Sequence, residues 1–356
     1  MPAGTAGMVE ALRRLVEAES FSSDPEGLER CASVIDELCT EILGSGTERI
    51  GDLHHRRWRR EGDRPVLLLC HFDTVWPPGT LAEWPFSVAD GVARGPGAFD
   101  MKAGIVQALH AVAEVGGPVT ILFTGDEEVG SPTSRAVIEE EARRARAALV
   151  LEPAAGTSVK VARKGVGGWS VRVEGRASHA GLDPAKGVSA IAEVAVQVER
   201  IHSLARPEVG TTVVVGTIGG GTAANVVPEA AWCTVDARMW SEDEDERIAQ
   251  AMRALEPSVP GARITVRGGL NRGPLPREAS EPLYRRLLGL GYDVGAAEVG
   301  GGSDGNFTAA LGVPTLDGLG PVGGGAHARD EHVLIDEMPR RAEMVARLAG
   351  DLLADG

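Results

Sequence analysis

Several features that mark other protein classes are scarce in this sequence. No apolar run approaches the roughly 18 residues that a membrane-spanning helix needs. Lys and Arg total only 36 against 51 Asp and Glu, which leaves a formal net charge of −15. This deficit of positive charge argues against nucleic acid or an anionic membrane surface as the main partner, because phosphate groups are bound by basic surfaces.

Cysteine is also scarce. The four cysteines, Cys31, Cys39, Cys70 and Cys233, form no C-x-x-C pair, so neither a disulfide framework nor a thiolate zinc site is predicted. Residues 1–20 contain no apolar segment of the kind found in secretion signals. We therefore expect reduced thiols and a cytoplasmic protein.

The sequence does contain enough apolar residues for a sizeable core, since 43% of its 356 residues are hydrophobic. This length predicts about two domains. The first part alternates short apolar runs with helical patterns, and we predict strands at 65–70, 119–124 and 148–151 and helices at about 101–115 and up to 147. Strands that alternate with helices predict a mainly parallel α/β sheet.

From residue 164 the pattern changes to a strand, a helix, two strands, a helix and a strand. This β-α-β-β-α-β order is typical of a ferredoxin-like module. The α/β character returns after residue 271 and ends in a helix at 336–353. We therefore expect a module at 164–271 that is inserted into a larger domain formed by 1–163 and 272–356.

Side chains that bind metals occur where predicted strands of the larger domain end. Two histidines with several carboxylates, and no cysteine, suit a hydrolytic zinc site better than a structural one. Because ligands bind at the carboxyl ends of parallel strands, we expect these side chains to converge. They are His71, Asp73, Asp100, Glu127, Glu128, Glu152 and His327.

Each of these residues also has a simpler interpretation. A single histidine at a strand end is most often packed or hydrogen-bonded in the core. Asp100 could cap the helix that follows it, and Glu127 with Glu128 could complement a helix dipole. Their joint occurrence at five places in the chain favours a site over independent coincidences.

The motifs resemble a known family, from about His71 to Leu352 in order and spacing. It is the family of di-zinc exopeptidases and amidohydrolases that includes glutamate carboxypeptidase, acetylornithine deacetylase, succinyl-diaminopimelate desuccinylase and aminoacylase. The bacterial glutamate carboxypeptidase branch is the most similar. The motifs that carry the resemblance are His71-x-Asp73-Thr74-Val75, Phe99-Asp100-Met101-Lys102, Asp126-Glu127-Glu128, Leu151-Glu152-Pro153, Ser178-His179-Ala180-Gly181, Gly301-Gly302-Ser303-Asp304, His327 and Pro339-Arg340-Arg341.

The resemblance implies two zinc ions per subunit, with Co²⁺ or Mn²⁺ as substitutes. His71 and Glu152 would bind one ion, Glu128 and His327 would bind the other, and Asp100 would bridge the pair. The resemblance also implies a cis peptide bond after Asp100.

Further implied roles concern the chemistry and the substrate. Asp73 would orient His71, and Glu127 would act as the general base toward a metal-bridging hydroxide. His179 would reach the active site of a partner subunit and stabilise the oxyanion there. An Arg fork can grip a carboxylate, and the glycines at 300–302 could offer backbone N–H groups or form a tight turn. The implied substrate-binding residues are Asn225, Arg272 and Gly301.

The resemblance therefore predicts a zinc-dependent carboxypeptidase that forms a homodimer through the inserted module. Its substrate would be a small peptide or an N-acyl amino acid, and it would release a C-terminal, glutamate-type amino acid. The alternatives are an N-acyl amino acid amidohydrolase or deacetylase, of the acetylornithine deacetylase, desuccinylase or aminoacylase type, and a dipeptidase. A non-catalytic binding protein on the same scaffold is a further alternative, which the complete set of ligands argues against.

Overall fold

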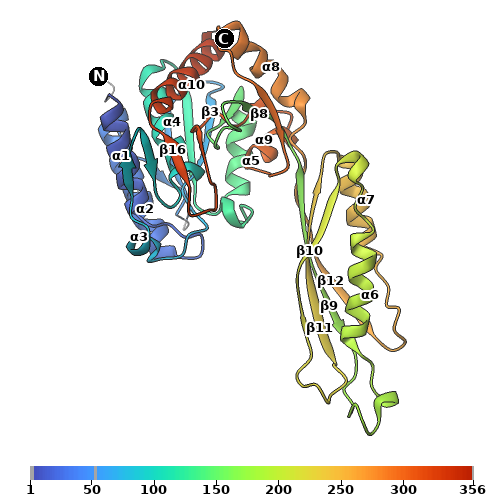
Figure 1. The fold of residues 1–356 in the computed structure, drawn as a ribbon. Helices are drawn as coiled ribbons and strands as arrows, with labels where there is room; N and C mark the ends of the chain where they lie inside the picture. The colour runs from blue at the N-terminus through green and yellow to red at the C-terminus, as the bar shows by residue number, and fades with distance from the viewer. Residues whose placement is uncertain (1–3, 52–53, 355–356) are drawn as a thin grey trace. The chain divides into compact units, whose positions relative to one another are not determined.

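The structure is a computed structural model that describes residues 4–51 and 54–354. The chain divides into two compact units (Figure 1). The first unit consists of Met1–Ala162, Leu275–Val299 and Ser303–Gly356, and the second of Arg163–Pro274 and Gly300–Gly302. No helix in the described ranges is long and apolar enough to cross a membrane.

The first unit is built on a six-stranded sheet. Strands β6, β3, β7 and β14 run parallel, and β2 and β1 extend the sheet in antiparallel pairing. The predicted α/β class with a mainly parallel sheet is confirmed. In spatial order the strands are β1 (Glu48–Arg49), β2 (Arg56–Arg60), β6 (Val119–Thr124), β3 (Val66–His71), β7 (Ala147–Val150) and β14 (Thr315–Leu316).

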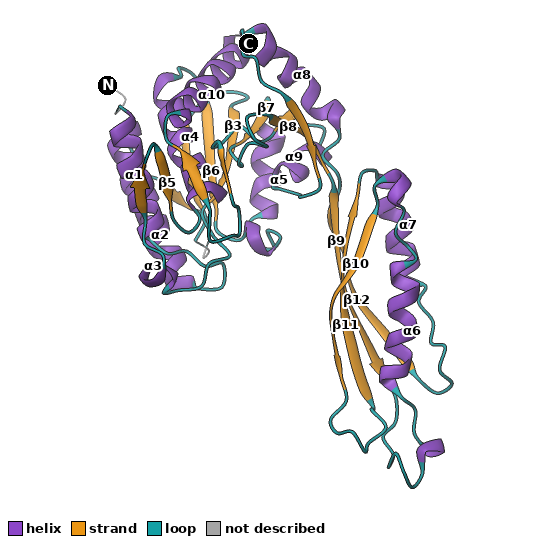
Figure 2. Cartoon of the chain, viewed as in Figure 1, coloured by secondary structure: helices purple, strands orange, loops and turns teal. Residues whose placement is uncertain are grey.

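Helices pack against both faces of this sheet (Figure 2). Val66 and Leu68 of β3 belong to one core, which also receives side chains from α1 (Thr5–Glu17), α2 (Pro25–Leu43), α4 (Ala103–Glu114), α8 (Arg277–Gly289) and α10 (Glu337–Ala354). Leu67 and Leu69 belong to a second core, with side chains from α5 (Arg135–Arg144) and α9 (Gly305–Ala310). Burial on both faces explains the continuous apolar run of β3.

The first unit also contains short elements that the sequence analysis does not predict. Most lie in segments rich in glycine and proline, where strands are too short for an alternating pattern to be recognised. One antiparallel sheet has the order β15 (Gly323–Gly324), β16 (His332–Leu334), β5 (Val92–Arg94) and β4 (Ser87–Ala89), and β13 (Ala296–Val299) pairs with β8 (Val159–Arg163). Helix α3 spans Thr80–Glu83.

The second unit has the predicted β-α-β-β-α-β order. Its elements are β9 (Gly165–Glu174), α6 (Ala190–His202), β10 (Thr212–Gly220), β11 (Ala230–Met239), α7 (Glu242–Arg253) and β12 (Arg263–Arg272). The strands form an antiparallel sheet in the order β10-β11-β9-β12, which leaves β10 at one edge. Alternate residues of β9, such as Val171 and Val173, form a separate core with Val194 of α6 and Ile248 of α7.

Candidate metal centre

Five side chains predicted to bind metal come together in the first unit. His71 is the last residue of β3, Glu128 follows β6, and Glu152 follows β7. Asp100 lies in the turn Ala98–Lys102 just before α4, and His327 lies in the loop after β15. The parallel strands therefore deliver three of the five ligands at one edge of the sheet, as their direction predicts.

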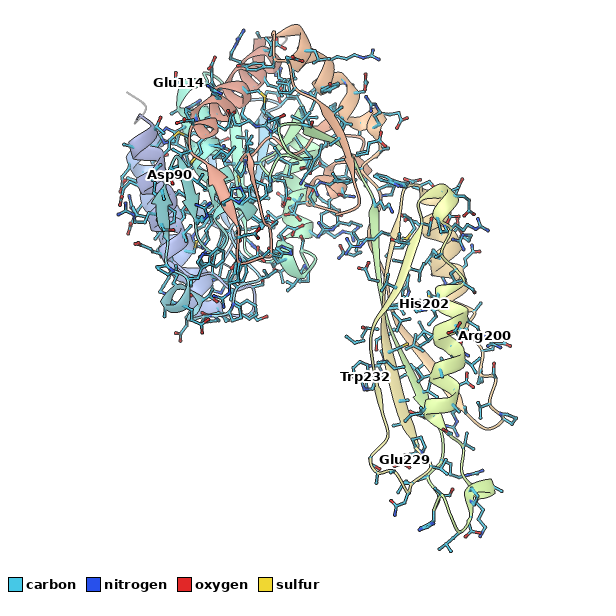
Figure 3. The ribbon with its side chains drawn as sticks, in the orientation of Figure 1. Asp90, Glu114, Arg200, His202, Glu229 and Trp232 are labelled. Atoms are coloured by element: carbon cyan, nitrogen blue, oxygen red, sulfur yellow. The ribbon has the colours of Figure 1, made fainter. Side chains whose placement is uncertain are left out.

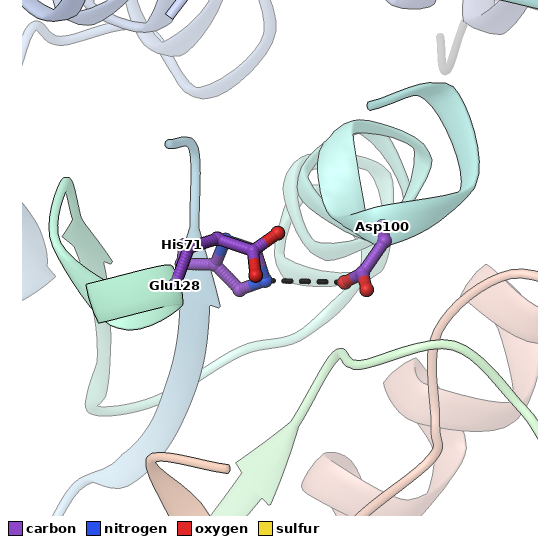
Figure 4. A group of neighbouring side chains, drawn as sticks. All are labelled: His71, Asp100 and Glu128. Atoms are coloured by element: carbon purple, nitrogen blue, oxygen red, sulfur yellow. Dashed lines mark hydrogen bonds and ion pairs between the residues drawn. The ribbon is translucent and has the colours of Figure 1, made fainter. Parts of the chain in front are cut away.

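Asp100 lies between the two imidazoles. Its Oδ1 is 3.2 Å from Nε2 of His71, and its Oδ2 is 3.4 Å from Nε2 of His327. Figure 4 shows Asp100 facing His71, with Glu128 beside them. Oε1 of Glu152 is 3.4 Å from Nε2 of His71, whereas Oε2 of Glu128 is 3.1 Å from Nε2 of His327. Each histidine nitrogen thus lies within 3.4 Å of Asp100 and of one further carboxylate.

These distances fit side chains that share a metal ion. Two ligand atoms that each lie about 2.0–2.1 Å from a tetrahedral zinc ion are about 3.3 Å apart. The nitrogen-to-oxygen distances around His71 and His327 are 3.1–3.4 Å. The nitrogen and oxygen atoms of these side chains are therefore of the kind that zinc binds, and they are spaced as zinc ligands are. Glu127 also approaches this group, because one of its oxygens lies within 4.8 Å of ligand atoms of His71 and Glu152.

The electrostatics of the cluster favour bound cations. Burial lowers the pKa of His71, but hydrogen bonds with Asp100, Asp73 and Glu152 outweigh burial and hold that pKa well above its ordinary value. Hydrogen bonds with Asp100 and then Glu128 raise the pKa of His327 to about 10. The crowded carboxylates thus stabilise positive charge on both imidazoles, and divalent cations could supply that charge instead.

The backbone at His327 is unusual. Its φ angle is 61°, in the left-handed region that residues other than glycine seldom adopt. Such conformations concentrate at functional sites, where surrounding structure maintains them. The peptide bond between Asp100 and Met101 is cis, which confirms the expectation for this bond.

Asp73 holds the segment after β6 as well as His71. The Nδ1 atom of His71 is 3.1 Å from the backbone oxygen of Asp73 and 3.4 Å from its Oδ1. The carboxylate itself accepts the backbone N–H groups of Glu127 and Glu128, each at 3.1 Å, and the hydroxyl of Ser22 at 2.8 Å. Asp73 is completely buried, so its carboxylate fixes the backbone of both glutamates.

Glu331 is a buried residue at this site that the sequence analysis missed. Its carboxylate accepts backbone N–H groups from the turn that carries Asp100. Such a role leaves no side-chain motif, because its partners are peptide groups far away in the sequence. The one available signal is that Glu331 lies four residues after His327, within the same loop.

Two predicted residues of the second unit, His179 and Asn225, lie side by side. The backbone oxygen of Asn225 accepts the N–H of Ala180 at 2.9 Å, and both residues are exposed. Nδ1 of His179 accepts the backbone N–H groups of Gly181 and Leu182, each at 3.1 Å. Because Nδ1 accepts, the neutral ring carries its proton on Nε2, which suits it to donate a hydrogen bond.

The other two, Arg272 and Gly301, lie at a different end of the second unit. Arg272 is buried, pairs with Val166 in the sheet, and donates from Nε to the side chain of Asn271 at 2.8 Å. The carbonyl oxygens of Gly301 and its neighbour Gly302 accept from Arg163 at 3.1 and 3.2 Å. Gly301 therefore presents its carbonyl to Arg163.

The four candidates of the second unit thus form two separate pairs. Along β9, Arg272 pairs opposite Val166, whereas His179 follows the strand beyond Glu174. The eight residue steps from Val166 to Glu174 span about 27 Å in an extended strand. One copy of this unit therefore cannot place both pairs around one small substrate.

Comparisons with known proteins match most of the chain to one family. Residues 67–351 match the profile of peptidase family M20/M25/M40. Carboxypeptidase G2 from Pseudomonas sp. (strain RS-16) is 30% identical over 370 residues, which cover 97% of this chain and 89% of that protein. Succinyl-diaminopimelate desuccinylase from Dechloromonas aromatica (strain RCB) is 28% identical, with 91% of this chain and 96% of that protein covered.

A solved structure has a similar fold. Aminopeptidase PepT from Bacillus cereus superposes with a TM-score of 0.74 and 21% identity, covering 99% of this chain and all of that chain. At this identity the likeness concerns the fold alone.

Proposed function

The chain belongs to peptidase family M20/M25/M40, and from this premise we propose that it is a zinc-dependent carboxypeptidase that releases a C-terminal, glutamate-type amino acid. Membership makes the chain a hydrolase of the metallopeptidase and amidohydrolase class, and the resemblance to this family is confirmed. The observation that carries the proposal is the position of Asp100. One of its carboxylate oxygens faces the imidazole of His71, and the other faces that of His327.

In this proposal the residues of the metal centre have separate roles. His71 and Glu152 would hold one zinc ion and Glu128 and His327 the other, and Asp100 would be a ligand shared between them. When bound, such ions lower the pKa of water and polarise a scissile carbonyl. Separately, Glu127 accepts the proton of the attacking water and passes it to the leaving amine.

Substrate recognition draws on the second unit. Arg272 and Gly301 lie at the end of its sheet where the chain enters at Arg163 and leaves at Pro274. We assign Arg272 to the terminal carboxylate of the substrate, because a guanidinium can bind a carboxylate through two parallel hydrogen bonds. His179 and Asn225, which lie beyond the other end of β9, are assigned to the active site of a second copy of the chain.

This assignment requires a homodimer, and the edge of the second unit supports one. Strand β10 pairs with β11 on one side and lies at the sheet edge on the other. Val214 and Ile218 of this strand are 52% and 58% exposed. Trp232 of β11 and Ile191 of α6 are 43% exposed each, and Trp232 is labelled in Figure 3. A long edge strand with apolar side chains is a template for pairing with another chain.

The amidohydrolase alternative keeps the same metal centre and changes the substrate. The relative named succinyl-diaminopimelate desuccinylase supports it, at nearly the same identity as carboxypeptidase G2. We also propose a cytoplasmic location, because the four cysteines are free thiols, as proteins of reducing compartments have.

Amino-acid release from a substrate panel by the zinc-loaded protein tests the proposal. The panel contains a peptide that ends in Glu, an N-acyl glutamate, N-acetylornithine, an N-acetyl hydrophobic amino acid and a dipeptide. We expect selective release of glutamate, measured by chromatography of the free amino acids. Release from N-acetylornithine alone would replace the carboxypeptidase with the deacetylase, and no release from any member with zinc bound would contradict both.

A further inference from the structure

Glu331 has no part in the proposed reaction, yet both oxygens of its carboxylate accept hydrogen bonds. The residue is 0% exposed. Its Oε1 accepts the backbone N–H groups of Phe99 at 2.9 Å and Asp100 at 3.0 Å. Its Oε2 accepts the N–H of Gly97 at 3.1 Å and the indole N–H of Trp76 at 3.0 Å. A buried carboxylate is costly unless it is hydrogen-bonded, and here both oxygens receive two donors each.

Two of these donors, Phe99 and Asp100, belong to the turn that carries Asp100, and Gly97 comes directly before it. This turn lies outside the strands of the sheet, so no ladder of backbone hydrogen bonds fixes it. The side chain of Asp100 has to stay between His71 and His327, and its backbone N–H is held by Glu331. The carboxylate of Glu331 therefore provides the hydrogen bonds that a neighbouring strand would otherwise provide. It does so at Asp100, which contacts both histidines.

The loop that carries Glu331 also carries His327. Its fold is closed by two backbone hydrogen bonds, from Ala328 to the oxygen of Gly325 at 2.9 Å and from Glu331 to the oxygen of Ala328 at 3.0 Å. This one loop thus provides two contacts to Asp100. The His327 imidazole contacts its side chain, and the Glu331 carboxylate accepts its backbone N–H. A displacement of either group would change the distance between Asp100 and His327.

We propose that Glu331 is a positioning residue, which holds Asp100 at its place between the two histidines and thereby sets the affinity of the site for divalent cations. The inference rests on the metal centre of the proposed function and not on the identity of the substrate. A partner that orients a metal ligand contributes about 10–100-fold in metal affinity or activity.

Zinc titration of the metal-free protein, in competition with a chelating dye, tests this role. In Glu331→Gln one oxygen becomes an NH₂ group that faces two N–H donors, so we expect zinc to bind about 10–100-fold more weakly. Glu331→Asp keeps the charge and both acceptor oxygens, and should restore part of the affinity. The matched control is Glu83→Gln, which neutralises an exposed carboxylate paired with Arg329 of the same loop at 2.9 Å and should bind zinc like the wild type.

Thermal unfolding of the metal-free variants separates positioning from general stability. A Glu331→Gln protein that melts earlier but binds zinc like the wild type would overturn the proposal. If this variant does not fold, Glu331→Asp and Trp76→Phe decide, because each leaves part of the hydrogen bonding in place; weaker zinc binding in both supports the proposal, and unchanged binding in both overturns it. The reaction is judged separately: tight zinc binding with no turnover of the panel contradicts the carboxypeptidase and leaves the role of Glu331 standing.

Discussion

In the first unit the candidate ligands Asp100, Glu128 and Glu152 each lie 3.1–3.4 Å from a histidine nitrogen, and buried carboxylates hold the backbones of Asp100 and Glu128. In the second unit His179 and Asn225 are exposed at one end of a sheet, and Arg272 is buried at the other. The first arrangement is complete within one chain. The second consists of two separate pairs, and in the proposed function only His179 and Asn225 require a second copy of the chain.

The two units thus differ in whether their proposed roles need one chain or two associated chains. Metal binding and water activation should depend on the first unit alone. Stabilisation of the oxyanion by His179 should depend on association.

Glu127→Gln should abolish most of the activity and leave the metal in place. The variant removes the proposed proton acceptor, and general acid–base catalysis contributes about 10²–10⁴-fold. Glutamate release gives the rate, and atomic absorption of the dialysed protein gives the metal content. A variant that loses its metal together with its activity would make Glu127 a ligand, since it lies near His71 and Glu152.

His179→Ala should lower turnover by about 10²–10³-fold, the usual effect of removing one oxyanion donor. If His179 acts in a second copy of the chain, subunits with His179→Ala and subunits with Glu127→Gln should restore activity when they are mixed and exchanged. Mixed dimers would contain one active site with both residues intact. Subunit exchange, measured by mass spectrometry of differently labelled chains, without recovered activity would place His179 outside the reaction.

Asp73→Asn should weaken zinc binding or turnover by about 10–100-fold. The amide could accept only one of the two N–H groups of Glu127 and Glu128 that the carboxylate now accepts. Ser22→Ala is the matched control, because it removes a hydroxyl from the same carboxylate and leaves both N–H contacts. Equal effects of the two substitutions would contradict a specific role of Asp73 in holding the glutamates.

Asp245→Asn should stabilise the protein, and more so at about pH 8 than at about pH 4. Burial, with a smaller contribution from Glu242, raises the pKa of Asp245 from 3.8 to about 7. The folded state therefore binds a proton more tightly than the unfolded state, and its stability falls as the pH rises from about 4 to about 7. Asp245→Asn removes this loss of stability at high pH. Asp243→Asn, at an exposed position of helix α7, is the control and should leave the loss unchanged. Melting temperatures at both pH values provide the measurement, and a gain that is independent of pH would contradict the prediction.

The strands that position the ligands could be predicted from the sequence, and the reason is physical. β3 and β6 are buried on both faces, so each appears as a short continuous apolar run with its polar residues just after it. The alternation of β9 and β11 follows equally from one buried face. Local patterns of this kind need no knowledge of distant residues.

Contacts between distant segments could not be predicted in the same way. Arg56 belongs to a basic run from 54 to 60, whose charges suggest solvent exposure, but its side chain is buried and 6% exposed. Arg57 and Arg59 both contact Glu141, at 2.6 and 2.8 Å. Glu331 is the same case at the metal centre, because its partners are backbone N–H groups more than 200 residues away. Neither partner changes the local pattern by which a segment is recognised.

The burial of every cysteine has a practical consequence. Cys31, Cys39, Cys70 and Cys233 are all buried, and burial raises the pKa of each thiol. Since the thiolate is the reactive form, maleimide reagents should spare the native protein. A cysteine in place of Leu182, which is 78% exposed beside His179, would then carry a single fluorophore, and energy transfer between two such labels would report how far apart these loops lie when chains associate.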